Sequence, residues 1–128
     1  MNGLLLDTHI FLWWAESSSK LPADLNDYIN RHRRVYLSSV VAWEVEIKQA
    51  KGMLVGESLD WPAVIADKQL ISLPVSFEHV IALRQLPAIH KDPFDRLLLA
   101  QAKSEKLQLA THDGTIWQYP DVLLLKVR

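Results

Sequence analysis

Short apolar runs alternate with longer helical patterns along the whole chain. The apolar runs are rich in β-favouring residues and predict strands at residues 4–6, 35–38, 71–75, 107–111 and 122–127. The first run consists of three leucines, which suits a strand that is buried on both faces. Because strands that alternate with helices build βαβ units, the sequence predicts an α/β fold with a central, mostly parallel sheet.

The segments between these strands predict helices, at residues 8–16, 21–32, 40–51, 61–70, 77–85 and 93–105, with a short one ending at residue 117. Ser39, Ser76 and Asp92 are the expected N-caps of three of these helices. Pro74 cannot donate to a central ladder, so its strand is expected at or near a sheet edge.

Composition limits the class of protein. A chain of 128 residues is expected to form one domain, residues 1–128. It has no cysteine, so any metal must be held by oxygen or imidazole ligands. The sequence shows no signal peptide and no apolar stretch long enough to cross a bilayer, so we expect a cytoplasmic protein. The net charge of −1 gives no overall attraction to nucleic acid, although the cluster at residues 31–34 permits RNA binding.

The predicted helix at residues 8–16 is apolar nearly all round, with Trp13 and Trp14 among its residues. A helix that lies on a sheet normally shows a polar stripe. Either a second helix of the chain covers this surface, or it faces a groove or a protein partner.

Asp7 directly follows the first strand, and three further carboxylates come to the same region of the predicted fold. Asp113 also follows a strand, while Glu44 and Asp95 lie in the opening turns of helices that start at the carboxyl edge of the sheet. In open α/β sheets, ligands bind outside this edge. All four side chains can therefore point into one crevice.

Each carboxylate also has a local explanation. Asp7 can cap the helix that follows it, and Asp113 can stabilise a turn with Gly114. Glu44 can pair with Lys48 one turn later, and Asp95 can reach back to the backbone of Asp92 in a capping box.

Taken together, the four carboxylates favour a cation. Carboxylates without counter-ions repel one another and raise each other's pKa, which a bound metal resolves. Oxygen ligands suit Mg²⁺ or Mn²⁺, and no pair of histidines has the spacing of a zinc site. Such a metal can deprotonate a water and stabilise charge on a phosphate, which indicates phosphodiester hydrolysis.

These motifs also resemble a known family. Residues 4–9, Leu-Leu-Leu-Asp-Thr-His, resemble the opening of a PIN domain, particularly that of the toxin ribonucleases of VapBC-type toxin–antitoxin pairs. Residues 38–48 are similar to the second acidic motif of that family, and residues 90–102 with residues 111–113 give the most specific match. The motifs keep the family's order, and the resemblance covers essentially the whole chain.

The resemblance implies that Asp7, Glu44, Asp95 and Asp113 form a catalytic set that binds Mg²⁺ or Mn²⁺. It further implies a three-layer α/β/α sandwich, a homodimer, and an antitoxin that blocks the site. Asp113 is followed by Gly114 rather than by a further acidic residue, so its position is the least typical of the family.

Other polar residues are expected near these carboxylates. Hydroxyls that could orient carboxylates or waters are those of Thr8, Ser38 and Thr111. Asp92 could add an outer carboxylate, although a helix cap explains it as well. Three histidines lie near the predicted crevice and could contact RNA, namely His9, His90 and His112. Arg96 could neutralise a phosphate or lie along the surface.

The sequence thus predicts a metal-dependent endoribonuclease that acts on single-stranded or looped RNA as a toxin. No side chain resembles an activated nucleophile, so a direct attack by water is expected. One alternative is a small Mg²⁺-dependent phosphotransfer domain, either a receiver or a phosphatase. A receiver needs an acidic pair after its first strand, and the phosphatase needs Asp-x-Asp, whereas residue 9 is His. The other alternative is a catalytically silent binding module, which the loss of acidic ligands would mark.

Overall fold

The computed structural model describes residues 2–32, 34–54 and 56–128. Its centre is a five-stranded sheet with the strand order β3-β2-β1-β4-β5. All the pairings between neighbouring strands are parallel. The strands are β1 (Leu4–Leu6), β2 (Val35–Ser38), β3 (Ile71–Leu73), β4 (Gln108–Thr111) and β5 (Leu124–Lys126).

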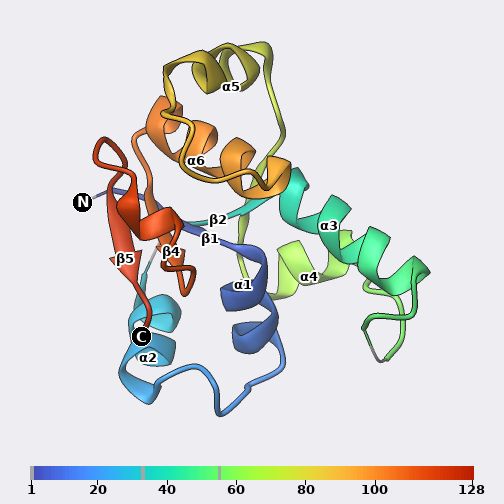
Figure 1. The fold of residues 1–128 in the computed structure, drawn as a ribbon. Coiled ribbons are helices and arrows are strands. Elements are labelled where there is room, and N and C mark those ends of the chain that lie inside the picture. The colour runs from blue at the N-terminus through green and yellow to red at the C-terminus, as the bar shows by residue number, and fades with distance from the viewer. Residues whose placement is uncertain (1, 33, 55) are drawn as a thin grey trace.

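Helices cover both faces of the sheet, as the sequence predicts. They are α1 (Thr8–Ala15), α2 (Ala23–Arg31), α3 (Ser39–Ala50), α4 (Trp61–Asp67), α5 (Phe77–Ala82) and α6 (Pro93–Glu105), with the 3₁₀ turns η1 (Leu83–Gln85) and η2 (Ile116–Gln118). Figure 1 shows α5 and α6 on one side of the sheet and α1, α2 and α4 on the other. The three-layer α/β architecture is confirmed. In the described ranges, no helix has both the length and the apolar character needed to cross a membrane.

The strand order puts a topological switch point between β1 and β4. The chain moves from β1 to β2 and β3 in one direction and then returns to place β4 on the other side of β1. Leu6 lies opposite Ala110, and the Asp7 amide donates to the Ala110 carbonyl at 3.1 Å. The residues that follow β1 and β4 therefore emerge side by side, at the position where parallel α/β sheets bind ligands.

The central strands and α6 form the core that fixes this edge. Leu4, Leu5 and Leu109 have no exposed side-chain surface, and neither do Leu98 and Leu99 of α6. Burial of each such leucine stabilises the fold by roughly 1.5–3 kcal/mol. A strand held on both faces cannot rotate, so the direction of the side chain that follows it is also fixed.

Some predicted boundaries differ from the structure. Ser38, not Ser39, caps α3, because its side-chain oxygen accepts from the Val40 amide at 3.0 Å and the helix starts at Ser39 itself. The edge position of β3 is confirmed, but the strand ends at Leu73, directly before Pro74. Ser76 and Asp92 cap α5 and α6 as predicted.

The aromatic helix α1 is covered largely from within the chain. Phe11 is buried and stacks on Trp61 of α4, with ring centroids 5.9 Å apart. Trp14 is buried and donates from its indole nitrogen to the Asn30 side chain of α2 at 2.9 Å. Trp13 is half-buried and packs its ring edge against His112. The apolar surface of α1 is therefore explained mainly by packing against α2 and α4.

Candidate active site at the carboxyl edge of the sheet

Asp7 lies between β1 and α1 and is almost fully buried. Its Oδ1 accepts from the Ile10 amide at 2.9 Å, so the capping role expected from the sequence is present. Burial raises the pKa of Asp7, while the Thr111 hydroxyl and the Ile10 amide act in the opposite direction. Capping a helix does not require a carboxylate to be buried in this way, so the cap alone leaves the cost of this charge unexplained.

Asp95 lies in the first turn of α6, which Asp92 caps. The Asp92 Oδ1 accepts from the Phe94 and Asp95 amides at 2.8 and 3.1 Å. Asp92 thus holds the cap, and the Asp95 side chain does not turn back toward it in a capping box. Instead, Asp95 Oδ2 lies 2.8 Å from Nε2 of His90.

Asp113 follows β4 and is held by its own loop. Its amide donates to the Thr111 hydroxyl at 3.1 Å, and its Oδ1 accepts from the Thr115 amide at 2.8 Å. The turn expected at Asp113 is therefore present. The other oxygen, Oδ2, lies 3.1 Å from His90 Nε2.

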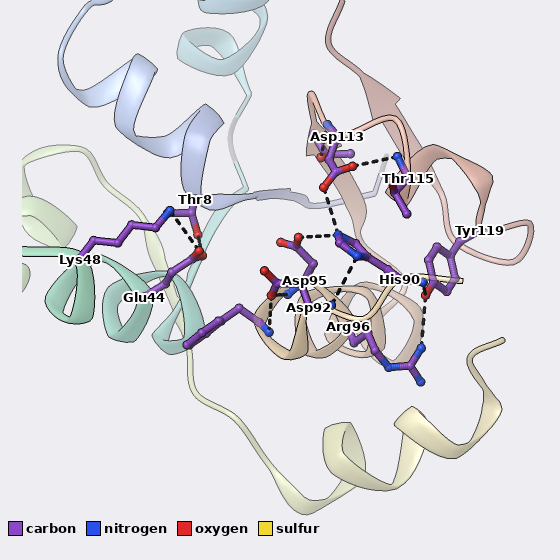
Figure 2. Close-up of polar contacts among 12 residues, drawn as sticks. Thr8, Glu44, Lys48, His90, Asp92, Asp95, Arg96, Asp113, Thr115 and Tyr119 are labelled. Atoms are coloured by element: carbon purple, nitrogen blue, oxygen red, sulfur yellow. Dashed lines mark hydrogen bonds and ion pairs between the residues drawn. The ribbon is translucent and has the colours of Figure 1, made fainter. Parts of the chain in front are cut away.

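His90 thus lies between the two carboxylates (Figure 2). One ligand atom from each of His90, Asp95 and Asp113 lies within 4.8 Å of the others, which is close enough to surround a metal ion. In the described part of the chain, Asp7 and Glu44 fall outside this tight group.

Glu44 comes from α3 and is held by two neighbours. Its Oε1 accepts from the Thr8 hydroxyl at 2.5 Å, and its Oε2 lies 3.3 Å from the Lys48 ammonium (Figure 2). The ion pair with Lys48, one turn along the helix, is therefore present. The contact with Thr8 also ties Glu44 to the start of α1, next to Asp7, and Thr8 orients a carboxylate as predicted.

Electrostatic coupling links all four carboxylates. Burial is the main cause that raises the pKa of Asp95 to about 7, and the charges of Asp92, Asp7 and Glu44 contribute to this rise against the opposing effect of His90. The charge of Asp113 adds to the raised pKa of Asp7. The predicted set therefore gathers at one edge and repels itself, as expected of a site that is built for a cation.

The other predicted residues have different surroundings. Ser38 uses its hydroxyl proton on Gln101 Oε1 at 2.5 Å, so the prediction that it orients a carboxylate of the site is wrong. Arg96 donates to the Pro87 carbonyl and the Tyr119 hydroxyl, and so holds the loop before α6. His112 bonds to the Val127 carbonyl, while exposed His9 packs beside Trp13.

The position of His90 between two carboxylates was not predicted from the sequence. Its backbone amide donates to the Tyr119 hydroxyl at 2.8 Å, which Arg96 also contacts, so residues far apart in the chain position the imidazole. The only local signal is that His90 precedes the N-cap of α6 by two residues, and its Nδ1 accepts from the Asp92 amide at 3.4 Å.

The donor set fits a divalent cation better than other chemistry. The candidate ligands are carboxylate oxygens at the end of parallel strands, and two of these carboxyl groups have raised pKa values without a cation. Oxygen-rich sets of this kind suit Mg²⁺ and Mn²⁺.

Comparison with known proteins identifies the family of the chain. The model of the PIN domain family matches residues 4–121 of the chain. A search of curated proteins by sequence found no match.

Several solved structures share the fold at low sequence identity. VapBC2 from Rickettsia felis, bound to a DNA fragment from its promoter, is 15% identical with a TM-score of 0.72, and the match covers 98% of each chain. DNA-bound VapBC from Salmonella typhimurium is 16% identical with a TM-score of 0.70 over 98% of each chain. A toxin–antitoxin complex from Klebsiella pneumoniae is 16% identical, with a TM-score of 0.66 over 97% of each chain.

Proposed function

Because the chain belongs to the PIN domain family, whose members are generally nucleases, we propose that it is a metal-dependent endoribonuclease and the toxin of a toxin–antitoxin pair. The observation that carries this proposal is the convergence of Asp7, Glu44, Asp95 and Asp113 on one edge of the sheet. Burial, together with the charges of neighbouring carboxylates, raises the pKa of Asp95 there to about 7. The toxin role is supported by structural neighbours that are toxin–antitoxin complexes.

The four carboxylates would hold Mg²⁺ or Mn²⁺. A divalent cation bound there would lower the pKa of a water and offset the charge that develops on a phosphate. The protein's own contribution is to fix the ligands: Thr8 orients Glu44, the cap of α6 places Asp95, and Thr115 holds Asp113.

RNA with unstacked nucleotides is the proposed substrate, because its backbone can approach a site at the edge of a sheet. We further propose a cognate antitoxin that blocks this edge, a homodimer, and a cytoplasmic location. The apolar side chains that α5 exposes, Phe77, Val80 and Ile81, are suited to a protein interface.

The first test is cleavage of RNA by the purified chain without antitoxin. We expect cleavage with Mg²⁺ or Mn²⁺ and none after addition of a chelator. Asp7→Asn and Asp95→Asn should each lower the rate at least about 100-fold, as expected when charge stabilisation at a reacting phosphate is lost. Asp121→Asn is the matched control, since this exposed carboxylate lies outside the site and should leave the rate unchanged.

Cleavage that does not depend on metal, or full activity in both site variants, would contradict the nuclease assignment. Folded but inactive wild-type protein with metal would favour the silent binding module. The toxin role has a separate test, which is growth arrest on expression that is relieved by co-expression of the neighbouring small reading frame.

A further inference from the structure

His90 occupies a special position in the candidate site, because one of its nitrogens contacts two of the proposed metal ligands. Nε2 lies 2.8 Å from Asp95 Oδ2 and 3.1 Å from Asp113 Oδ2. The imidazole is only 18% exposed, and its loop is anchored by the bond from its amide to Tyr119.

The hydrogen bonds of His90 define which nitrogen carries the proton. Nδ1 faces the Asp92 amide, which is a donor, so Nδ1 must be the acceptor. The proton of a neutral imidazole is then on Nε2, which donates it between the two carboxylates. A histidine that binds a metal through Nε2 needs a free lone pair on that nitrogen and normally donates from the other one. The arrangement at His90 is the reverse.

Both oxygens of Asp113 already accept a hydrogen bond. Its Oδ1 accepts from the Thr115 amide at 2.8 Å, and its Oδ2 accepts from His90. Nε2 of His90 lies between Oδ2 of Asp113 and Oδ2 of Asp95, so a cation that bridges these two oxygens must displace the Nε2–H.

From this geometry we propose that His90 is a positioning residue that occupies the place of the divalent cation between Asp95 and Asp113 and releases both carboxylates when a cation binds. The inference rests on the proposed metal site but does not follow from it. In the metal-free protein, the Nε2–H holds together two carboxylates that would otherwise repel each other. The site therefore remains assembled before the cation arrives.

Thermodynamic linkage determines whether removal of the His90 side chain strengthens or weakens metal binding. If His90 contacts the carboxylates only in the metal-free state, its removal destabilises that state alone and must strengthen metal binding. If His90 were a ligand, its removal would weaken binding. If it contacted the carboxylates equally in both states, its removal would change nothing.

The experiment is calorimetric titration of Mn²⁺ into the full chain without antitoxin. We expect His90→Ala to bind Mn²⁺ about tenfold more tightly than wild type, which corresponds to 1.4 kcal/mol. His90→Gln retains a side-chain N–H and should give an intermediate affinity. His32→Ala removes a histidine at the end of α2 and serves as the matched control, with unchanged affinity.

A second measurement uses the wild-type protein and so does not depend on how a variant folds. Histidine labelled with ¹⁵N reports by NMR which ring nitrogen carries the proton, and Mg²⁺ can be added without paramagnetic broadening. We expect Nε2 of His90 to stay protonated when Mg²⁺ binds. Its proton should then exchange faster with solvent, because its hydrogen bonds to the carboxylates are lost.

Three results would overturn the proposal: weaker or unchanged Mn²⁺ binding by His90→Ala, transfer of the proton from Nε2 to Nδ1 with Mg²⁺, or a hydrogen bond that survives saturation with metal. If the protein binds metal and also gives any of these results, the role proposed for His90 is wrong but the proposed metal site of the nuclease is not contradicted. Failure of both wild type and His90→Ala to bind Mn²⁺ would overturn the metal site and the role of His90 together.

Discussion

Asp95 and Asp113 contact the same nitrogen of His90, yet the pKa values of their carboxyl groups move in opposite directions. Burial raises the pKa of Asp95 to about 7, assisted by the charge of Asp92. Burial would also raise the pKa of Asp113, but hydrogen bonds from the Thr115 amide and from His90 outweigh it and lower the pKa. The difference follows from hydrogen bonding, because Asp113 accepts two donors, while His90 is the partner that the structure gives Asp95.

These shifts predict how the stability of the metal-free protein depends on pH. The pKa of Asp95 is higher in the folded chain, at about 7, than its ordinary value of 3.8. Its contribution to stability is therefore fully present below the ordinary pKa and is lost as the pH rises toward 7. Asp7, whose pKa is also raised, acts in the same direction. Asp113 has a lowered pKa, so its contribution is lost only at more acidic pH.

With a chelator present, we expect the Tm difference between Asp95→Asn and wild type to grow in favour of the variant from about pH 4 to about pH 8. Asp95→Asn removes the charge and keeps an acceptor for His90, so it should be the more stable protein at the upper end. Asp121→Asn should follow the wild-type profile. Thermal unfolding monitored by circular dichroism gives the Tm values. A Tm difference between Asp95→Asn and wild type that stays constant with pH would contradict the raised pKa of Asp95.

At the level of elements, a buried polar chain joins the two helices on the α5–α6 side of the sheet to β2. The Ser38 hydroxyl donates to Gln101 of α6 at 2.5 Å, and the Gln101 amide lies 3.3 Å from Nδ1 of His79 on α5. His79 Nε2 completes the chain with a 2.8 Å contact to Glu105. Gln101 is fully buried at the centre of this network, so α6 and its Asp95 are oriented by hydrogen bonds as well as by apolar packing.

Removal of the central member should be costly. Gln101→Ala removes the acceptor of the buried Ser38 hydroxyl proton and one of the contacts of the His79 ring. We therefore expect a loss of about 2 kcal/mol in the free energy of unfolding. Glu105→Gln changes the half-exposed end of the same network and should cost less than about 1 kcal/mol. Urea denaturation of the two variants gives both values. Equal losses in the two variants would contradict the central position of Gln101 in this network.

Sequence reasoning located the strands and helices because each leaves a local pattern, such as Leu4–Leu6 or the cap at Asp92 before Pro93. It also indicated the candidate carboxylates, since chain order places each at the start of a helix or the end of a strand. It missed the position of His90, which depends on Tyr119, a residue 29 positions away. It placed Ser38 in the site because the distant partner Gln101 leaves no trace in the residues around Ser38.

At the scale of the molecule, the strand order assembles the site from the whole chain. β1 and β4 are neighbours in the sheet although about a hundred residues separate them, and α3 and α6 bring Glu44 and Asp95 to the same edge. Burial of the central strands keeps the carboxylates in place, and His90, Asp113 and Asp7 lie in the segments that join the elements. The opposite end of α6 packs against α5 (Figure 1). The apolar side chains of Phe77, Val80 and Ile81 on α5 are exposed.

The exposed apolar side chains of α5 are a candidate interface for the proposed homodimer. Phe77 is 84% exposed and Ile81 is 50% exposed, which is unusual for side chains of this size. If they form the homodimer interface, Phe77→Glu with Ile81→Glu should convert a dimer into a folded monomer in sedimentation velocity experiments. Glu57→Gln, at another exposed site, should leave the dimer intact. A double variant that remains dimeric would place the interface elsewhere.

The carboxylates beside the ends of β1 and β4 are proposed to hold a divalent cation. Anomalous diffraction at the manganese absorption edge, from crystals of the antitoxin-free protein with saturating Mn²⁺, tests it most directly. We predict an anomalous peak in contact with carboxylate oxygens of the set formed by Asp7, Glu44, Asp95 and Asp113, and loss of that peak in Asp95→Asn. No peak at this edge of the sheet, or a peak that persists unchanged in Asp95→Asn, would contradict the account.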